Sequence, residues 1–136
     1  MMFLDTNTVI AIINDRPPAV RNAFERRLAD AQQIAVGSIV IHELRYGIAK
    51  SRLRSHNEAL LRAFIEGPVA LAPFDEMDAA VAGELRAQLG KVGTPIGPYD
   101  VLIAGQALRH KATLVTANTR EFKCVKGLRV EDWTQE

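Results

Sequence analysis

Oxygen-bearing side chains that could bind a metal ion stand beside apolar segments at four places in this sequence. They are Asp5, Glu43, Asp100 and the pair formed by Asn118 and Glu121. Carboxylates that are brought together repel one another, and a divalent cation is the simplest counter-charge. Their hard oxygen atoms suit Mg²⁺ or Mn²⁺. A metal ion held in this way supports chemistry on phosphate esters, because it activates water and neutralises charge on the phosphate oxygens.

The segments around these residues predict short strands that alternate with helices. Apolar runs indicate strands over residues 2–4, 34–36, 69–71, 113–115 and 128–130. Helical spacing indicates helices over residues 8–13, 19–29, 38–50 with Ser38 as its N-cap, 57–66 and 98–111. One more helix begins near residue 75, with Met77, Val81, Leu85 and Leu89 as its buried stripe. This alternation predicts a single α/β domain over residues 1–136, with a short, mostly parallel central sheet flanked by helices (α/β/α).

Ligands bind such sheets at the carboxyl ends of the strands, and Asp5 and Asn118 fall there. Each candidate also has an ordinary structural role. Asp5 could equally be the N-cap of the next helix, and Glu43 could be an exposed carboxylate. Asp100 lies in a first helical turn, where the helix dipole would lower its pKa. Asn118 and Glu121 match a capping box, in which Asn118 caps the third amide and Glu121 reaches back.

Other chemistries find little support in the sequence. The single cysteine, Cys124, excludes an internal disulfide and a cysteine-based zinc cluster. The three histidines, His42, His56 and His110, lack metal-ligand spacing, and no glycine-rich phosphate loop is present. The net charge of +1 gives no general attraction to nucleic acid, so any contact with RNA depends on local basic clusters. Without a signal-peptide pattern or a long apolar stretch, we expect a soluble cytoplasmic protein.

Four segments together carry a specific resemblance to a known family: MFLDTNTVI, SIVIHELRYGIAKS, GTPIGPYDVLIAGQAL and LVTANTREFKCVKGLRVEDW. The chain resembles the PIN domain, and in detail the VapC toxins of bacterial toxin–antitoxin pairs. The resemblance implies a Mg²⁺-dependent endoribonuclease, with Mn²⁺ as an alternative ion. Such toxins commonly cut tRNA, often in the anticodon loop, and so inhibit translation.

The resemblance also implies roles for particular residues. The family's acidic positions fall on Asp5, Glu43 and Asp100, of which Asp5 and Asp100 are the expected metal ligands. The frequent fourth aspartate falls on Asn118, which removes one negative charge from the catalytic set. Glu121 is the nearest acid that could compensate. Thr6 occupies a polar position that supports the first aspartate, and Asn7 is expected to support it more weakly.

The expected partners follow from the same resemblance. They are an RNA substrate and a cognate VapB-type antitoxin, with a toxin homodimer inside a larger hetero-oligomer and no membrane. An antitoxin of this kind lays an apolar segment along its toxin. The apolar helical segments 19–28 and 40–48, together with Tyr46, could frame the groove that receives it.

One rival interpretation remains open, and two others lack the motif that they require. A PIN-like module could bind RNA or protein without cutting it, and Asn118 in place of an acid is the feature that favours this reading. A receiver domain needs paired acids after its first strand, where this chain has only Asp5. A phosphatase of the haloacid dehalogenase type needs an Asp-x-Asp motif, and Asn7 stands in its second place.

Overall fold

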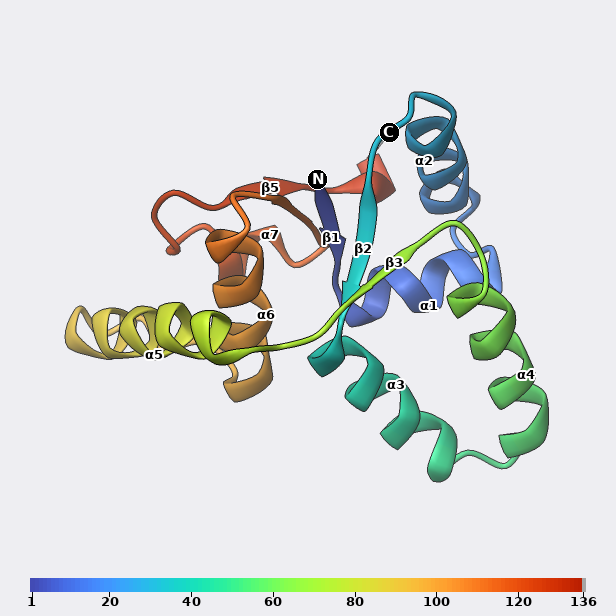
Figure 1. Cartoon of the computed structure of the whole chain (residues 1–136), viewed down its shortest axis with the longest axis horizontal. Coiled ribbons are helices and arrows are strands. Elements are labelled where there is room, and N and C mark those ends of the chain that lie inside the picture. The colour runs from blue at the N-terminus through green and yellow to red at the C-terminus, as the bar shows by residue number, and fades with distance from the viewer. Residues whose placement is uncertain (136) are drawn as a thin grey trace.

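The computed structural model describes residues 1–135 as one five-stranded sheet with helices around it (Figure 1). All neighbouring strands pair in parallel, in the order β3-β2-β1-β4-β5. The predicted α/β class and parallel sheet are therefore confirmed. The strands are β1 (Met2–Leu4), β2 (Ile34–Gly37), β3 (Ala70–Ala72), β4 (Thr113–Val115) and β5 (Arg129–Glu131).

Seven α-helices connect and cover these strands. In Figure 1, α5 and α6 lie on one side of β1 and β2, α1 and α2 lie on the other, and α3 runs down from the end of β2. The helices are α1 (Thr6–Asn14), α2 (Pro18–Ala29), α3 (Ser38–Ala49), α4 (Arg54–Ile65), α5 (Glu76–Lys91), α6 (Pro98–Arg109) and α7 (Thr119–Phe122), and a 3₁₀ turn covers Trp133–Gln135. Among residues 1–135, no helix combines the length and the apolar character needed to cross a membrane.

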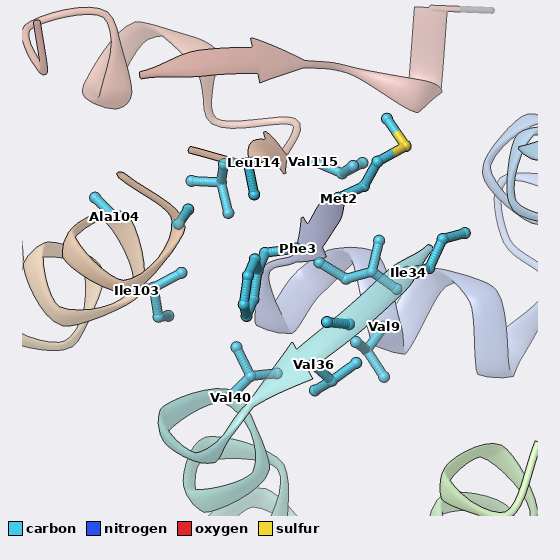
Figure 2. Packing of buried hydrophobic residues seen from close by; sticks show 14 of the residues in the cluster. Met2, Phe3, Val9, Ile34, Val36, Val40, Ile103, Ala104, Leu114 and Val115 are labelled. Atoms are coloured by element: carbon cyan, nitrogen blue, oxygen red, sulfur yellow. The ribbon is translucent and has the colours of Figure 1, made fainter. Parts of the chain in front are cut away.

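The hydrophobic core lies on both faces of the three central strands (Figure 2). Leu4, Val36, Leu114 and Val115 are fully buried. Continuous apolar strands are typical of parallel sheets that are covered on both sides. Burying each side chain of this size contributes about 1.5–3 kcal/mol, so the core fixes the strands firmly.

The register of the strands determines where the polar residues emerge. Leu4 is paired with Val115, and Gly37 is paired with Ala72. The residues that follow these positions therefore leave the sheet at one common edge, its carboxyl edge. Asp5 follows β1 there, α3 begins there, and Asn118 comes three residues after β4.

Two local predictions are wrong. Ser38 is not an N-cap: Gly37 takes that position, and the Ser38 hydroxyl accepts a hydrogen bond from the Phe74 amide at 3.2 Å. A Cβ atom at position 37 would lie 2.0 Å from Gln106 Oε1, so a larger residue there would force the Gln106 side chain to move. Met77 is not part of the buried stripe of α5, since it is 61% exposed, whereas the neighbouring Asp78 is completely buried. The α5 helix is rotated in this way because it meets α6 through its polar Asp78 as well as through its apolar side chains.

Candidate functional site

The first acid of the site, Asp5, is held rigidly at the end of β1. Its amide donates to the Val115 carbonyl at 3.1 Å, which ties it to β4. Its Oδ1 accepts from the Thr8 amide at 2.9 Å and so caps α1. The side chain is 8% exposed. The capping role is confirmed, but it uses only one of the two carboxylate oxygens.

Glu43 is brought to the same edge by a contact between α1 and α3. The Thr6 hydroxyl donates to Glu43 Oε1 at 2.6 Å, across 37 residues of sequence. Glu43 is half-buried and is therefore not the freely exposed carboxylate of the alternative interpretation. The Thr6 hydroxyl thus orients Glu43, whereas the family resemblance gave Thr6 a role in supporting Asp5. Asn7 is exposed and makes none of the side-chain hydrogen bonds found within residues 1–135.

Asp100 and Glu121 meet at the N-terminus of α6. The Gly97 amide donates to Glu121 Oε1 at 3.0 Å. A Cβ atom on Gly97 would lie 3.2 Å from Asp100 Oδ2 and 3.8 Å from Glu121 Oε1, so both carboxylates crowd this glycine. Glu121 comes from the short α7, and it thus joins the end of β4 to the start of α6.

The pKa of Asp100 reports this crowding. Burial raises the pKa of Asp100 to about 6, and the charge and hydrogen bonding of Glu121 add to the effect, followed by the charges of Glu43 and Asp5. The prediction that the helix dipole lowers this pKa is wrong, because burial and three neighbouring carboxylates together outweigh the dipole. Asp5, Glu43 and Glu121 therefore all act on Asp100, although they come from distant parts of the sequence.

The predicted capping box of Asn118 and Glu121 is also wrong. Asn118 is exposed and makes no side-chain cap; its Nδ2 donates instead to Glu121 Oε2. The Asn118 amide donates to Thr116 Oγ1 at 2.9 Å. The two oxygens of Glu121 divide their contacts: Oε2 accepts from the Asn118 side chain, and Oε1 accepts from the Gly97 amide at 3.0 Å rather than from the Asn118 backbone amide. Glu121 therefore lies nearer to the acids than Asn118 does.

The four acids Asp5, Glu43, Asp100 and Glu121 are called the acid cluster below. None of them takes part in the ion pairs formed within residues 1–135. No three Asp, Glu, His or Cys side chains of the described part of the chain are gathered closely enough to hold a metal ion as they stand. The cluster is thus open, and its donor chemistry fits a hard cation that would draw the carboxylates inward.

An apolar groove of about 260 Å³ adjoins the acid cluster between α1, α3 and α4. Glu43 forms part of its wall, and its apolar lining includes Ile10, Ile13, Leu44, Ile48 and Leu60. The predicted segment 40–48 forms the α3 wall of this groove, whereas neither segment 19–28 nor Tyr46 lines it and α4 forms the third wall.

The sequence analysis gave no role to two aromatic neighbours of the acids. His42 precedes Glu43, Tyr99 precedes Asp100, and the two rings lie 5.5 Å apart between their centroids. Both side chains are exposed. An aromatic residue directly before an acid, at two separate places, was the signal available in the sequence.

Comparisons with known proteins agree with this arrangement. The PIN domain family profile matches residues 2–128. The chain is 38% identical over 130 residues to the tRNA(fMet)-specific endonuclease VapC of Salmonella typhimurium, and the match covers 96% of each chain. It is 39% identical over 130 residues to Ribonuclease VapC2 of Rickettsia felis, again over 96% of each chain.

Solved structures give the same result. The fold matches VapBC2 from Rickettsia felis bound to a DNA fragment from its promoter, with a TM-score of 0.90 and 37% identity over 98% of this chain and 99% of that chain. It matches DNA-bound VapBC from Salmonella typhimurium with a TM-score of 0.88 and 38% identity over 97% of both chains. Sequence and fold agree along nearly the whole length, and the chain therefore belongs to the PIN domain family and, within it, to the VapC proteins.

Proposed function

We propose that this chain is a Mg²⁺-dependent endoribonuclease, the toxin of a type II (VapBC) toxin–antitoxin pair. The observation that carries the proposal is the acid cluster, whose members come from four separate elements and pair with no cationic side chain within residues 1–135. A protein rarely gathers partly buried carboxylates unless something positive binds among them. Relatives named as endonuclease and ribonuclease support RNA as the substrate.

We assign metal binding to Asp5 and Asp100, with Glu43 and Asn118 completing the catalytic set. A bound Mg²⁺ would supply an activated water and neutralise charge that develops on the phosphate oxygens. The cap bond to Asp5 Oδ1 holds this carboxylate in one orientation. Asp100 loses its proton to bind the cation, because a positive charge lowers its pKa.

Three further residues support this set. Thr6 fixes Glu43 through the 2.6 Å hydrogen bond. Glu121 anchors the N-terminus of α6 through Gly97 and is the acid that compensates for the missing charge at position 118. Asn7 is exposed next to Asp5, and we assign it only a minor supporting role at the rim.

The partners follow from the same assignment. The substrate is tRNA cut in a single-stranded loop, the anticodon loop in particular, because unpaired nucleotides can be drawn into an open site. This substrate places the reaction in the cytoplasm. The apolar groove beside Glu43 fits the apolar segment of a VapB-type antitoxin. A toxin homodimer within a larger complex completes the proposed assembly.

The test is cleavage of purified tRNA by the purified chain. We expect cleavage that requires added Mg²⁺, stops in a chelator, and is lost in Asp5→Asn. The matched control is Glu84→Gln, which removes one exposed charge from α5, far from the acid cluster. Folded protein that binds tRNA but never cuts it with any divalent ion would support the alternative, a non-cleaving PIN-like module that binds RNA or protein.

A further inference from the structure

Helix α3 presents two different surfaces on either side of Glu43. One is the wall of the apolar groove, formed by Glu43, Leu44 and Ile48. The other is an exposed stripe at helical spacing, formed by His42, Arg45, Tyr46 and Lys50. The stripe has no acidic member, and it is called the aromatic–basic stripe below.

Exposed aromatic rings gather at this place. Both tyrosines of the sequence are here, Tyr46 at 62% exposure and Tyr99 at 47%. The Tyr99 ring faces the His42 ring, at 5.5 Å between centroids, and so extends the stripe onto the start of α6. Lys50 Nζ lies 4.6 Å above the Tyr46 ring. By contrast, the only tryptophan and the phenylalanines Phe3, Phe24 and Phe122 are buried in the core.

The stripe ends at the acid cluster. His42 is the sequence neighbour of Glu43, and Tyr99 is the neighbour of Asp100. Residues four apart on a helix are about 6 Å apart, so His42, Tyr46 and Lys50 form a track that leads away from the carboxylates. Arg52 adds a positive charge just beyond the end of α3, whereas the nearby Arg54 is paired with Glu58 at 3.4 Å.

We propose that the aromatic–basic stripe is a binding track for single-stranded RNA. This inference rests on the proposed function and adds the surface that positions the substrate. One nucleobase stacks on the Tyr99–His42 pair beside the acids, and a second stacks on Tyr46. Arg45 and Lys50 contact the phosphates between them. Aromatic platforms within positively charged surfaces are the usual means of binding unpaired nucleotides.

Charge complementarity favours RNA over the antitoxin as the occupant of this stripe. The antitoxin segment is apolar, and the groove on the opposite side of α3 offers it an apolar lining. The stripe offers two cations and three aromatic rings, which suit a chain of phosphates and bases. The two partners then approach the acids from opposite sides of α3.

The experiment measures the affinity of the chelator-treated protein for a labelled single-stranded RNA of about ten nucleotides. Because no metal is present, binding is read without cleavage. We expect Tyr46→Leu and Tyr99→Leu each to raise Kd about tenfold, since one base stack is worth about 1–3 kcal/mol. Tyr46→Phe and Tyr99→Phe keep a flat ring and should bind like the native chain. The matched control is Val92→Ala, at an exposed apolar position after α5.

A second probe separates stacking from charge. An abasic oligonucleotide of the same length has phosphates but no bases. The native chain should bind it more weakly than either single leucine variant binds the normal RNA, because both stacks are lost at once. A variant that carries both Tyr46→Leu and Tyr99→Leu should bind the two probes alike. Lys50→Gln should instead reduce the salt dependence of binding to either probe.

Several outcomes would overturn the inference. Native affinity in both leucine variants would do so, and so would phenylalanine variants that lose as much as the leucine variants. Unchanged RNA binding together with loss of the complex with co-expressed antitoxin would assign the stripe to the antitoxin. If the native chain cuts no RNA, but the leucine and phenylalanine variants still differ as expected, then the track stands while the proposed nuclease fails.

Discussion

A poorly exposed aspartate lies near each end of helix α6, and the two have opposite electrostatic surroundings. Near its C-terminus, Asp78 of α5 is completely buried. Its Oδ2 accepts from the Asp75 amide at 3.0 Å and from Gln106 Nε2 at 3.3 Å. Its Oδ1 makes no hydrogen bond, but Arg109 Nη1 lies at 3.7 Å and His110 Nε2 at 3.6 Å. The Arg109 guanidinium supplies the positive charge that offsets Asp78.

Asp100, at the N-terminus of α6, has the reverse surroundings. Its charged neighbours are Glu121, Glu43 and Asp5, which raise its pKa together with burial. The comparison separates two uses of a carboxylate. Where the chain supplies its own cations, the acid joins α5 to α6. Where it supplies only more acids, the site is left to an external cation.

The largest effect expected from this comparison concerns catalysis. Asp100→Asn should lower the rate of tRNA cleavage about a hundredfold or more, because it removes charge from the place where phosphate charge must be stabilised. Asp78→Asn, the same chemical change at the other aspartate, should leave the rate per folded molecule close to native. Single-turnover cleavage measures both. Equal losses of cleavage rate in the two variants would contradict the different roles assigned to Asp100 and Asp78.

The second effect concerns stability, for which Asp78 should matter more than Asp100. Asp78→Ala should lower the free energy of unfolding by about 2–3 kcal/mol, because it breaks the reciprocal capping box of α5 and removes one buried partner each from Arg109 and Gln106. Asp100→Asn should not destabilise the metal-free chain. Denaturant titration of both variants provides the measurement. A variant at Asp78 as stable as the native chain would show that this buried acid has no structural role.

The third effect distinguishes Glu121 from Asn118. Glu121→Gln should weaken the affinity for Mg²⁺ about tenfold, because Glu121 carries charge and touches Gly97 beside Asp100. Asn118→Ala should cost less than about 0.5 kcal/mol of stability, since it removes no cap. Asn118→Asp should restore the fourth charge and tighten Mg²⁺ binding. Calorimetric titration with Mg²⁺ measures the affinity of each variant. A larger loss of affinity in Asn118→Ala than in Glu121→Gln would assign the stronger role in metal binding to Asn118.

The smallest effect is a pH dependence of the metal-free chain. Asp100 has a pKa of about 6 when folded and 3.8 as the reference value. Between these values the folded state keeps a proton that the unfolded state has lost, so stability falls as pH rises from 4 to 6 and stays low above it. The loss is about 1 kcal/mol, since solvent reaches half of the side chain. The difference in Tm between Asp100→Asn and the native chain should therefore grow over this range, and Mg²⁺ at pH 7 should abolish it.

The sequence alone determined the frame of the molecule. Apolar runs such as Met2–Leu4 and residues 34–36 are strands in the structure as predicted, because a parallel sheet covered on both faces buries such runs completely. Parallel strands share their carboxyl edge, so the position of Asp5 directly after a strand was sufficient to place it at that edge. These features depend on local pattern and on a topology that has few alternatives.

The tertiary structure decided which polar residues meet. The N-T-R-E segment reads locally as a capping box, yet Glu121 extends to Gly97, which lies 24 residues away in sequence. Asp78 has the sequence position of a first-turn acid on a surface helix, yet it is completely buried beside Arg109 and His110. Tyr99 meets His42 only when α6 is placed beside α3. A side chain several bonds long can satisfy its charge in many places, and only the packed arrangement of the helices selects one of them.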